Sequence, residues 1–191
     1  VINPIPDSVL HGFIDKFKPF KCIPDQEVMN GLTVYHPRFL SIPGYLKSIE
    51  IISYKRAVQR VVDEIGFDFD LIDLHWTFPD LPTGDFLSKK YHVPFNVTLR
   101  GMEAFHFQDN DIRQRIVAKY LGKANKVISL SEEMASAAQR IADTGHKTTV
   151  IRNGVDTDKF FYIDKTKCRN QLGLSNDKQI VLGVGALIHR K

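Results

Sequence analysis

Residues 127–160 read VISLSEEMASAAQRIADTGHKTTVIRNGVDTDKF, and this stretch decides the fold. It opens with a short apolar run at 127–130, which predicts a strand. A helical pattern follows directly, and its apolar face consists of Met134, Ala137, Ala138 and Ile141. A second strand, rich in β-branched residues, is predicted at 148–151. The stretch is therefore a strand–helix–strand unit.

The ends of this helix carry their own signals. Either Ser129 or Ser131 can open it, and Ser129 with Glu132 fits the Ser-x-x-Glu capping box. Gly145 is placed to end the helix in a left-handed conformation. After the second strand, Asn153-Gly154 predicts a tight turn, a role more common for this pair than catalysis.

The rest of the chain repeats the same alternation. Strands are predicted at 69–74, 94–99 and 179–185, and helices at 51–65 and 112–121. Residues 36–44 are predicted to form a loop, because Pro37 and Pro43 bias their neighbours toward extended geometry. Helices that alternate with short strands predict an α/β fold with a Rossmann-like parallel sheet and helices on both faces.

The composition is that of an ordinary globular protein, with 43% hydrophobic and 25% charged residues. No apolar run approaches the roughly 20 residues that span a bilayer, and we expect no signal peptide. Cys22 and Cys168 lie far apart, which argues against a disulfide framework or a zinc site and favours the cytoplasm. The net charge of +4 and two basic clusters allow a peripheral contact with anionic lipid, but no nucleic-acid motif is present. The clusters are Lys16, Lys18 and Lys21, and then Lys47, Lys55, Arg56 and Arg60.

The same stretch resembles the end of the first domain in glycosyltransferases of family 4, also called group 1, which have the GT-B fold. The matching residues follow the family pattern Ser-Glu, then VIxNGVDxxxF, and are Ser131, Glu132, Val150, Ile151, Asn153, Gly154, Val155, Asp156 and Phe160. Residues 98–101 read Thr-Leu-Arg-Gly, where many members have a histidine in place of the arginine. The arginine form resembles bacterial surface-polysaccharide transferases of the teichuronic-acid type.

The resemblance implies a division of the chain into two parts. Residues 1–152 would be the Rossmann-like, acceptor-binding domain, which is one half of the GT-B fold. Residues 153–191 would be the linker and the truncated start of the donor-binding domain. There the family commonly has Gly-Arg-Leu-x-x-x-Lys, in which arginine and lysine hold the donor diphosphate. Lys191 matches the lysine, whereas Ala186 stands where the arginine is expected.

Polar residues follow three predicted strands, and ligands of open parallel sheets bind at the carboxyl ends of the strands. We therefore predict the site at this edge. The predicted catalytic residues are His75, Arg100 and Glu103, and the predicted substrate-binding residues are Trp76, Gly101, Ser131, Glu132 and Lys191. Each also has a structural alternative, such as a hydrogen-bonded histidine, a packed tryptophan or a glutamate stabilised by a helix dipole.

The roles expected of these side chains follow from their chemistry. The planar guanidinium of Arg100 suits a phosphate or carboxylate of the acceptor. Trp76 could stack on a sugar face, and Glu103 could bind hydroxyl groups. A departing diphosphate must be stabilised by cations or helix N-termini, and Ser131 and Glu132 lie at a predicted helix start.

The predicted function is transfer of a sugar from a nucleotide-sugar donor to a glycan or lipid-linked acceptor in surface polysaccharide synthesis. The resemblance implies no metal and no cofactor, with the nucleotide sugar as a substrate. We expect a cytoplasmic enzyme at the inner membrane face, and we expect this chain to be inactive alone because the donor half is missing. Two alternatives stay open: a GT-B-like sugar-nucleotide epimerase, and a non-catalytic glycan-binding module.

Overall fold

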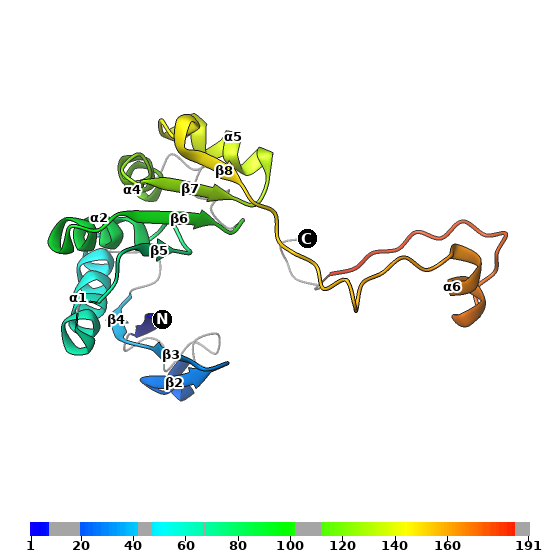
Figure 1. Cartoon of the computed structure of the whole chain (residues 1–191), viewed down its shortest axis with the longest axis horizontal. Helices are drawn as coiled ribbons and strands as arrows, with labels where there is room; N and C mark the ends of the chain where they lie inside the picture. Colours follow the sequence, from blue (N-terminus) through cyan, green and yellow to red (C-terminus); the bar gives the residue numbers. More distant parts are fainter. Residues whose placement is uncertain (8–19, 42–46, 67, 102–111, 186–191) are drawn as a thin grey trace. The chain divides into compact units, whose positions relative to one another are not determined.

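A computed structural model of the chain describes residues 1–7, 20–41, 47–66, 68–101 and 112–185 (Figure 1). The chain divides into two compact units, one at 1–153 and the other at 154–191. That the second unit begins a donor-binding domain stays a prediction.

A four-stranded parallel sheet forms the centre of the first unit. Its strands lie in the order of the sequence and are β5 (Ile72–Leu74), β6 (Phe95–Leu99), β7 (Lys126–Ser129) and β8 (Thr148–Val150). The connecting helices are α2 (Asp80–Tyr91), α4 (Ile112–Leu121) and α5 (Glu132–Ile141). The predicted α/β fold with a parallel sheet flanked by helices is therefore confirmed (Figure 1).

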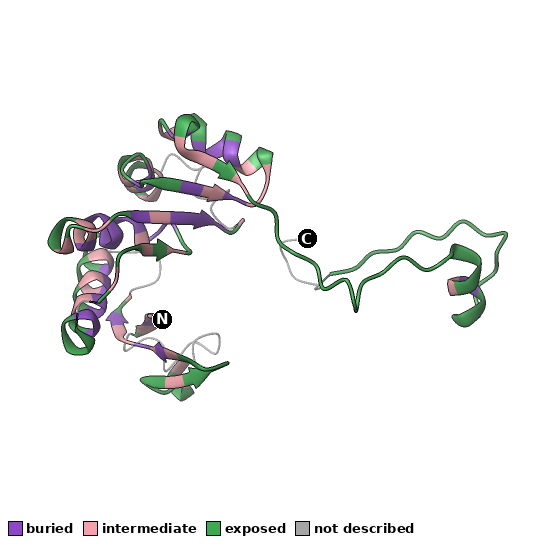
Figure 2. Ribbon diagram, viewed as in Figure 1, coloured by how far each residue is buried: buried purple, intermediate pink, exposed green. Residues whose placement is uncertain are grey.

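The core lies between the sheet and these helices. Phe95, Val97 and Leu99 are buried in one cluster with side chains of α2, α4 and α5 (Figure 2). Because successive strand residues point to opposite faces, Asn96 and Thr98 belong to the other face of the sheet. Packing is closest where α2 crosses β5: a Cβ added to Gly84 would lie 2.5 Å from Leu74 Cδ1. Only glycine fits there without displacing a core side chain.

Helix α1 (Lys47–Ile65) builds a second cluster. Tyr54, Val58 and Val62 are buried, and the Tyr54 ring packs edge-on against Phe39 at 4.9 Å between centroids. The helix predicted at 51–65 is confirmed, and Ile65 at its end is exposed.

Two small sheets precede α1. β1 (Ile5–Asp7) pairs in parallel with β4 (Arg38–Leu40), and β2 (Gln26–Met29) forms a hairpin with β3 (Leu32–Tyr35). The hairpin turns at Asn30 and Gly31, which both have positive φ. The prediction of a loop at 36–44 is wrong for β4, because pairing with β1 supplies backbone hydrogen bonds that local proline preferences do not reveal.

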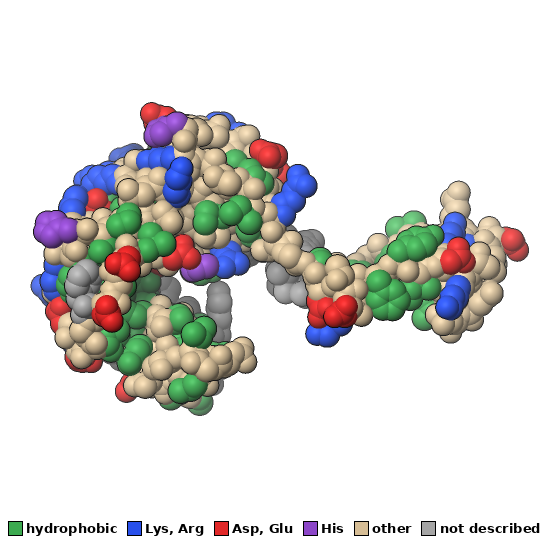
Figure 3. All heavy atoms as spheres, viewed as in Figure 1, with side chains coloured by type: hydrophobic (Ala, Val, Ile, Leu, Met, Phe, Trp, Pro, Cys, Tyr) green, Lys and Arg blue, Asp and Glu red, His purple; other side chains and the backbone are tan. Residues whose placement is uncertain are grey.

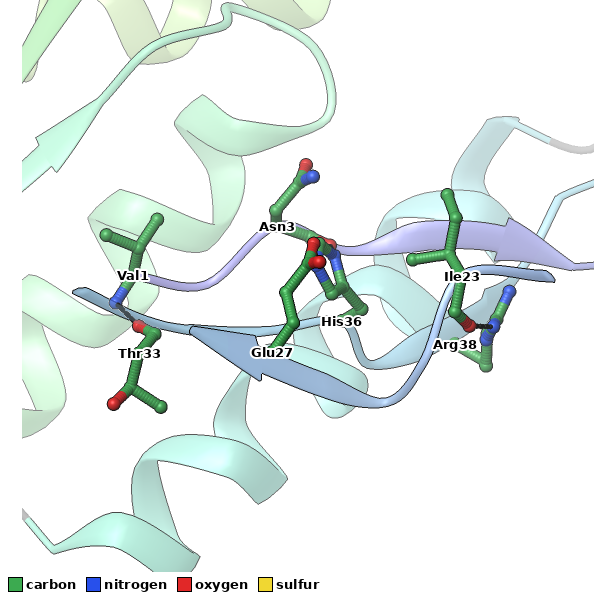
Figure 4. A network of polar contacts seen from close by, with 7 residues as sticks. All are labelled: Val1, Asn3, Ile23, Glu27, Thr33, His36 and Arg38. Carbon is green, nitrogen blue, oxygen red and sulfur yellow. Dashed lines mark hydrogen bonds and ion pairs between the residues drawn. The ribbon is translucent and has the colours of Figure 1, made fainter. Parts of the chain in front are cut away.

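Buried His36 links the segment before β1 to the hairpin (Figure 4). Its Nδ1 donates to the carbonyl of Asn3 at 3.0 Å, and its Nε2 lies 2.9 Å from Glu27 Oε1. Arg38 then donates to the carbonyls of Phe20, at 2.6 Å, and Ile23. These bonds hold the backbone carbonyls of Asn3, Phe20 and Ile23 to the side chains of His36 and Arg38.

The structure selects Ser131 from the two predicted starts of the helix in the deciding stretch, and it corrects the predicted end. The N-cap of α5 is Ser131, whose Oγ accepts from the Met134 backbone N–H at 3.2 Å, while Ser129 ends β7. The helix ends at Ala142 in an extended conformation, before Gly145 is reached. Gly145 instead begins the 3-10 helix η3 (Gly145–Lys147). A bond from the Lys147 backbone N–H to the Thr144 carbonyl, at 3.1 Å, explains why the chain turns here without a left-handed glycine.

The second unit contains one helix, α6 (Lys165–Gln171), within residues 154–185. Gly173 has a φ of 65° and follows the helix. The predicted turn at Asn153-Gly154 is wrong, because the turn forms three residues later, where the Asp156 carboxylate accepts from the Asp158 backbone N–H at 3.1 Å. The strand predicted at 179–185 is also wrong: no neighbouring strand pairs with it among the residues that the structure describes, and Val181 is fully exposed.

Candidate functional site at the carboxyl edge of the sheet

The register of the sheet brings the ends of β5, β6 and β7 to one edge. Leu74 pairs with Val97, and Leu99 pairs with Ser129. Residues that follow these strands therefore start from the same edge, as the sequence predicts. In α/β sheets this edge is where ligands bind.

Arg100 and His75 meet there directly. The Arg100 Nη2 lies 2.6 Å from His75 Nδ1, and Arg100 Nε donates to the same nitrogen at 3.2 Å. On its other side, His75 Nε2 lies 3.1 Å from Asp73 Oδ2. The three side chains form a line from β5 to the end of β6, and the side chains of both His75 and Asp73 are about half exposed. Two predicted catalytic residues are thus in contact with each other.

The end of β6 also approaches the start of α5. Gly101 has a φ of 112°, a region that favours glycine. A Cβ placed on Gly101 would lie 3.9 Å from Met134 Cε, in the first turn of α5. This contact places Gly101 beside the helix start that contains Ser131 and Glu132, so two further predicted residues belong to the same edge.

At the start of α5, the Met134 N–H already has a side-chain partner, and the first turn of the helix is acidic. The Ser131 hydroxyl accepts the Met134 N–H, and the Ser129 hydroxyl donates to the Ser131 carbonyl at 2.8 Å. Glu132 and Glu133 occupy the first turn and are exposed. Two carboxylates offset the positive end of the helix dipole, which makes this turn a poor site for an anion and a better one for hydroxyl groups.

The loop after β5 carries Trp76, which is exposed by 43% and accessible for stacking. Asp80 begins α2 and accepts a hydrogen bond from the Tyr54 hydroxyl at 2.6 Å. Burial, reinforced by the Asp80 carboxylate, raises the pKa of Tyr54 well above its usual value. Tyr54 is therefore held as a neutral donor that ties α1 to α2.

Two predicted site residues, Glu103 and Lys191, lie outside the described residues. Within the described ranges, no group of three or more His, Cys, Asp or Glu side chains is arranged to hold a metal ion. The absence of a metal from the reaction stays a prediction. No helix among the described residues is long and apolar enough to cross a membrane.

Sequence reasoning missed Asp73 as a partner of the site. A signal was present, because Asp73 lies on a predicted strand and His75 follows it by two residues, a spacing that places side chains on the same side of an extended chain. The hydrogen bond between Tyr54 and Asp80 joins residues 26 positions apart, and no local sequence pattern predicts it.

Comparison with known proteins places this geometry in a family. The model of Glycosyltransferase Family 4 matches residues 19–159, which is most of the chain and includes the whole described edge. The chain belongs to glycosyltransferase family 4. The predicted resemblance is therefore confirmed.

The individual relative that the chain matches is distant from it in sequence. It is 25% identical over 176 residues to a Bacillus subtilis (strain 168) protein whose name assigns it to teichuronic acid biosynthesis as the glycosyltransferase TuaC. The match covers 88% of this chain and 44% of that relative, so the chain spans less than half of its length.

Solved structures support the family 4 fold. Sucrose-phosphate synthase from Thermosynechococcus elongatus superposes with a TM-score of 0.54 at 17% identity, covering 82% of this chain and 41% of the synthase. HepE from Anabaena, in complex with UDP and glucose, superposes with a TM-score of 0.53 at 22% identity. The match covers 75% of this chain and 38% of HepE. These likenesses confirm the fold as one half of a GT-B glycosyltransferase.

Proposed function

We propose that this chain forms the acceptor-binding part of a glycosyltransferase that moves a sugar from a nucleotide-sugar donor to a glycan or lipid-linked acceptor. The observation that carries the proposal is the pair formed by Arg100 and His75 at the carboxyl edge of a family 4 sheet. The likeness to HepE, solved with UDP and glucose, supports a nucleotide-sugar donor. The likeness to TuaC supports surface polysaccharide synthesis as the setting.

The edge supplies groups suited to different parts of an acceptor. Arg100 offers a planar set of donors to a phosphate or carboxylate. Glu132, exposed at the start of α5, accepts from sugar hydroxyls, and Trp76 offers a face on which a sugar ring can stack. The family supports this transferase proposal over the epimerase and the glycan-binding module.

A peripheral contact with the inner membrane face belongs to the same proposal. From Arg113 to Lys126 the sequence contains five basic residues and no acidic one, namely Arg113, Arg115, Lys119, Lys123 and Lys126. Figure 3 shows Lys and Arg side chains gathered along the side of the first unit that carries α2 and α4. Each such charge near an anionic leaflet contributes about 1 kcal/mol to binding. This supports an enzyme that works in the cytoplasm on a membrane-bound acceptor.

The test uses protein made from the complete coding sequence that contains these residues. Labelled UDP-sugars are supplied with membrane lipid extracts, and transfer into the lipid fraction is measured. We expect Arg100→Ala to lower transfer by about ten- to a hundredfold, the effect of losing a charged hydrogen bond to the acceptor. Arg140→Ala, an exposed arginine in the last turn of α5, is the matched control and should retain activity. Conversion of the donor without any acceptor would identify an epimerase and refute the proposal.

A further inference from the structure

Asp73, His75 and Arg100 lie in a line, and Asp73 has no role in the proposed function. Asp73 lies on β5, His75 follows one residue past the end of the strand, and His75 Nε2 lies 3.1 Å from the Asp73 carboxylate. The register sets Asp73 beside Asn96 of β6, on the face opposite the buried Phe95 and Val97. Pairing within the sheet therefore fixes the position of Asp73, and His75 follows only two residues later in the chain.

We infer that Asp73 is a positioning residue, which sets the tautomer of His75 and thereby holds the guanidinium of Arg100 for an anionic group of the acceptor. The inference rests on the proposed function, since it takes Arg100 as the acceptor-binding group. It adds a residue to the site and narrows the acceptor to one that carries a phosphate or a carboxylate.

The hydrogen-bonding capacities of the three groups carry the argument. An ionised carboxylate only accepts, so the 3.1 Å contact with Asp73 requires a hydrogen on His75 Nε2. A guanidinium only donates, so the contacts of Nη2 at 2.6 Å and Nε at 3.2 Å require a lone pair on His75 Nδ1. Both demands are met by one neutral tautomer, with hydrogen on Nε2. Asp73 and Arg100 select that tautomer from opposite sides of the ring.

The double contact also fixes the direction of the guanidinium. Two of its nitrogens donate to the single acceptor at Nδ1, which sets the plane of the fork relative to the histidine ring. A guanidinium held in a fixed plane suits the oxygens of a phosphate or carboxylate. If His75 adopted the other tautomer, Nδ1 would present a hydrogen to Arg100, and the fork would turn away.

The first measurement reads the tautomer and requires no enzyme activity. In the 191-residue chain with 15N-labelled histidine, long-range 1H–15N correlation distinguishes the protonated ring nitrogen from the other. We expect hydrogen on Nε2 of His75 in the native chain and a mixture of tautomers in Asp73→Asn, because an amide can donate as well as accept. Asp73→Glu retains a carboxylate and should restore the Nε2–H form. Asp70→Asn, at an exposed neighbouring position, is the matched control.

The second measurement follows the Arg100 side-chain N–H signal while inorganic phosphate is added. We expect Asp73→Asn to weaken phosphate binding by about three- to tenfold, the value of one hydrogen bond. Asp70→Asn should bind as the native chain does. The inference is overturned if Asp73→Asn leaves the tautomer or the phosphate affinity unchanged. If both change as expected but Arg100→Ala spares sugar transfer in the complete enzyme, the proposed function fails while the positioning role of Asp73 stands.

Discussion

Asp63 links the ends of two helices through exposed polar contacts. Its carboxylate, near the end of α1, accepts from Lys90 Nζ at 2.7 Å and from the Tyr91 hydroxyl at 2.7 Å, both near the end of α2. The hydrogen bond from Lys90, followed by that from Tyr91, lowers the pKa of Asp63 below 3.8. A carboxyl whose pKa is lower in the folded than in the unfolded state stabilises the fold only while it is ionised.

The pH dependence of this contribution follows from its sign. The stabilisation by Asp63 is fully present above pH 3.8, the pKa expected for this carboxyl in the unfolded chain. It is lost as the pH falls through the lower pKa of the folded state. We expect Asp63→Asn to lower the urea midpoint at about pH 6 and the difference from the native chain to shrink toward about pH 3. Asp68→Asn, an exposed aspartate of the following segment, is the control. Equal midpoints for Asp63→Asn and the native chain at the higher pH would contradict the prediction.

At the scale of single residues, the sequence predicted which residues follow the ends of the strands, but not which of their side-chain atoms contact one another. His75 and Arg100 could be predicted as neighbours, because parallel strands bring their carboxyl ends together. That Arg100 contacts Nδ1 while Asp73 contacts Nε2 could not, because it depends on the register of β5 against β6 and on side-chain rotamers. The catalytic and binding roles of these residues stay predictions.

Among the elements, α5 shows how one residue sets a boundary. Its N-cap Ser131 has the extended backbone of a cap, with φ −152° and ψ 158°, and its Oγ satisfies the Met134 N–H. Such a cap satisfies one of the first N–H groups of the helix, which have no partner within the helix itself.

We expect Ser131→Ala to lower the free energy of unfolding by about 0.5–2 kcal/mol, the usual cost of losing an N-cap side chain. Ser136→Ala, an exposed position inside the same helix, is the control and should be neutral or slightly stabilising, since alanine has the highest helix propensity. Chemical denaturation of the two variants measures the difference. Equal effects of both substitutions would show that the cap contributes nothing.

Helices were predictable from sequence and several strand and turn boundaries were not. The apolar spacing that predicted α4 and α5 is a local property and survives in the structure. β4 was missed and a strand at 179–185 was wrongly expected, because a strand exists only where another strand pairs with it. The turn lies at Asp156 and not at Asn153-Gly154, because both the carbonyl and the carboxylate of Asp156 accept backbone N–H groups of the residues that follow.

At the scale of the whole chain, the two units differ in how they bury their side chains. Within 1–153, two clusters of apolar side chains are buried, whereas Phe160, Tyr162 and Val181 of the second unit are exposed. The second unit relies on local bonds, such as those from the Arg169 guanidinium to the carbonyls of Ser175, at 3.2 Å, and Lys178, at 2.9 Å.

We therefore expect a chain that ends after Asn153 to unfold at nearly the same temperature as the 191-residue chain, within about 2–4 °C. A chain that ends after Leu130 removes α5 and β8, including the buried Ala137 and Ala138, and should lose cooperative unfolding. Circular dichroism during heating compares the three chains. A large drop in the midpoint after removal of 154–191 would show that this segment stabilises the first unit.

The order of the strands has a consequence for how the sheet is made. Each of β6, β7 and β8 pairs with the strand that precedes it in the chain, so none waits for a partner that the ribosome has yet to produce. As synthesis proceeds from the amino terminus, every new strand meets an edge that is already present. The sheet with the Arg100 edge can thus assemble one β-α step at a time.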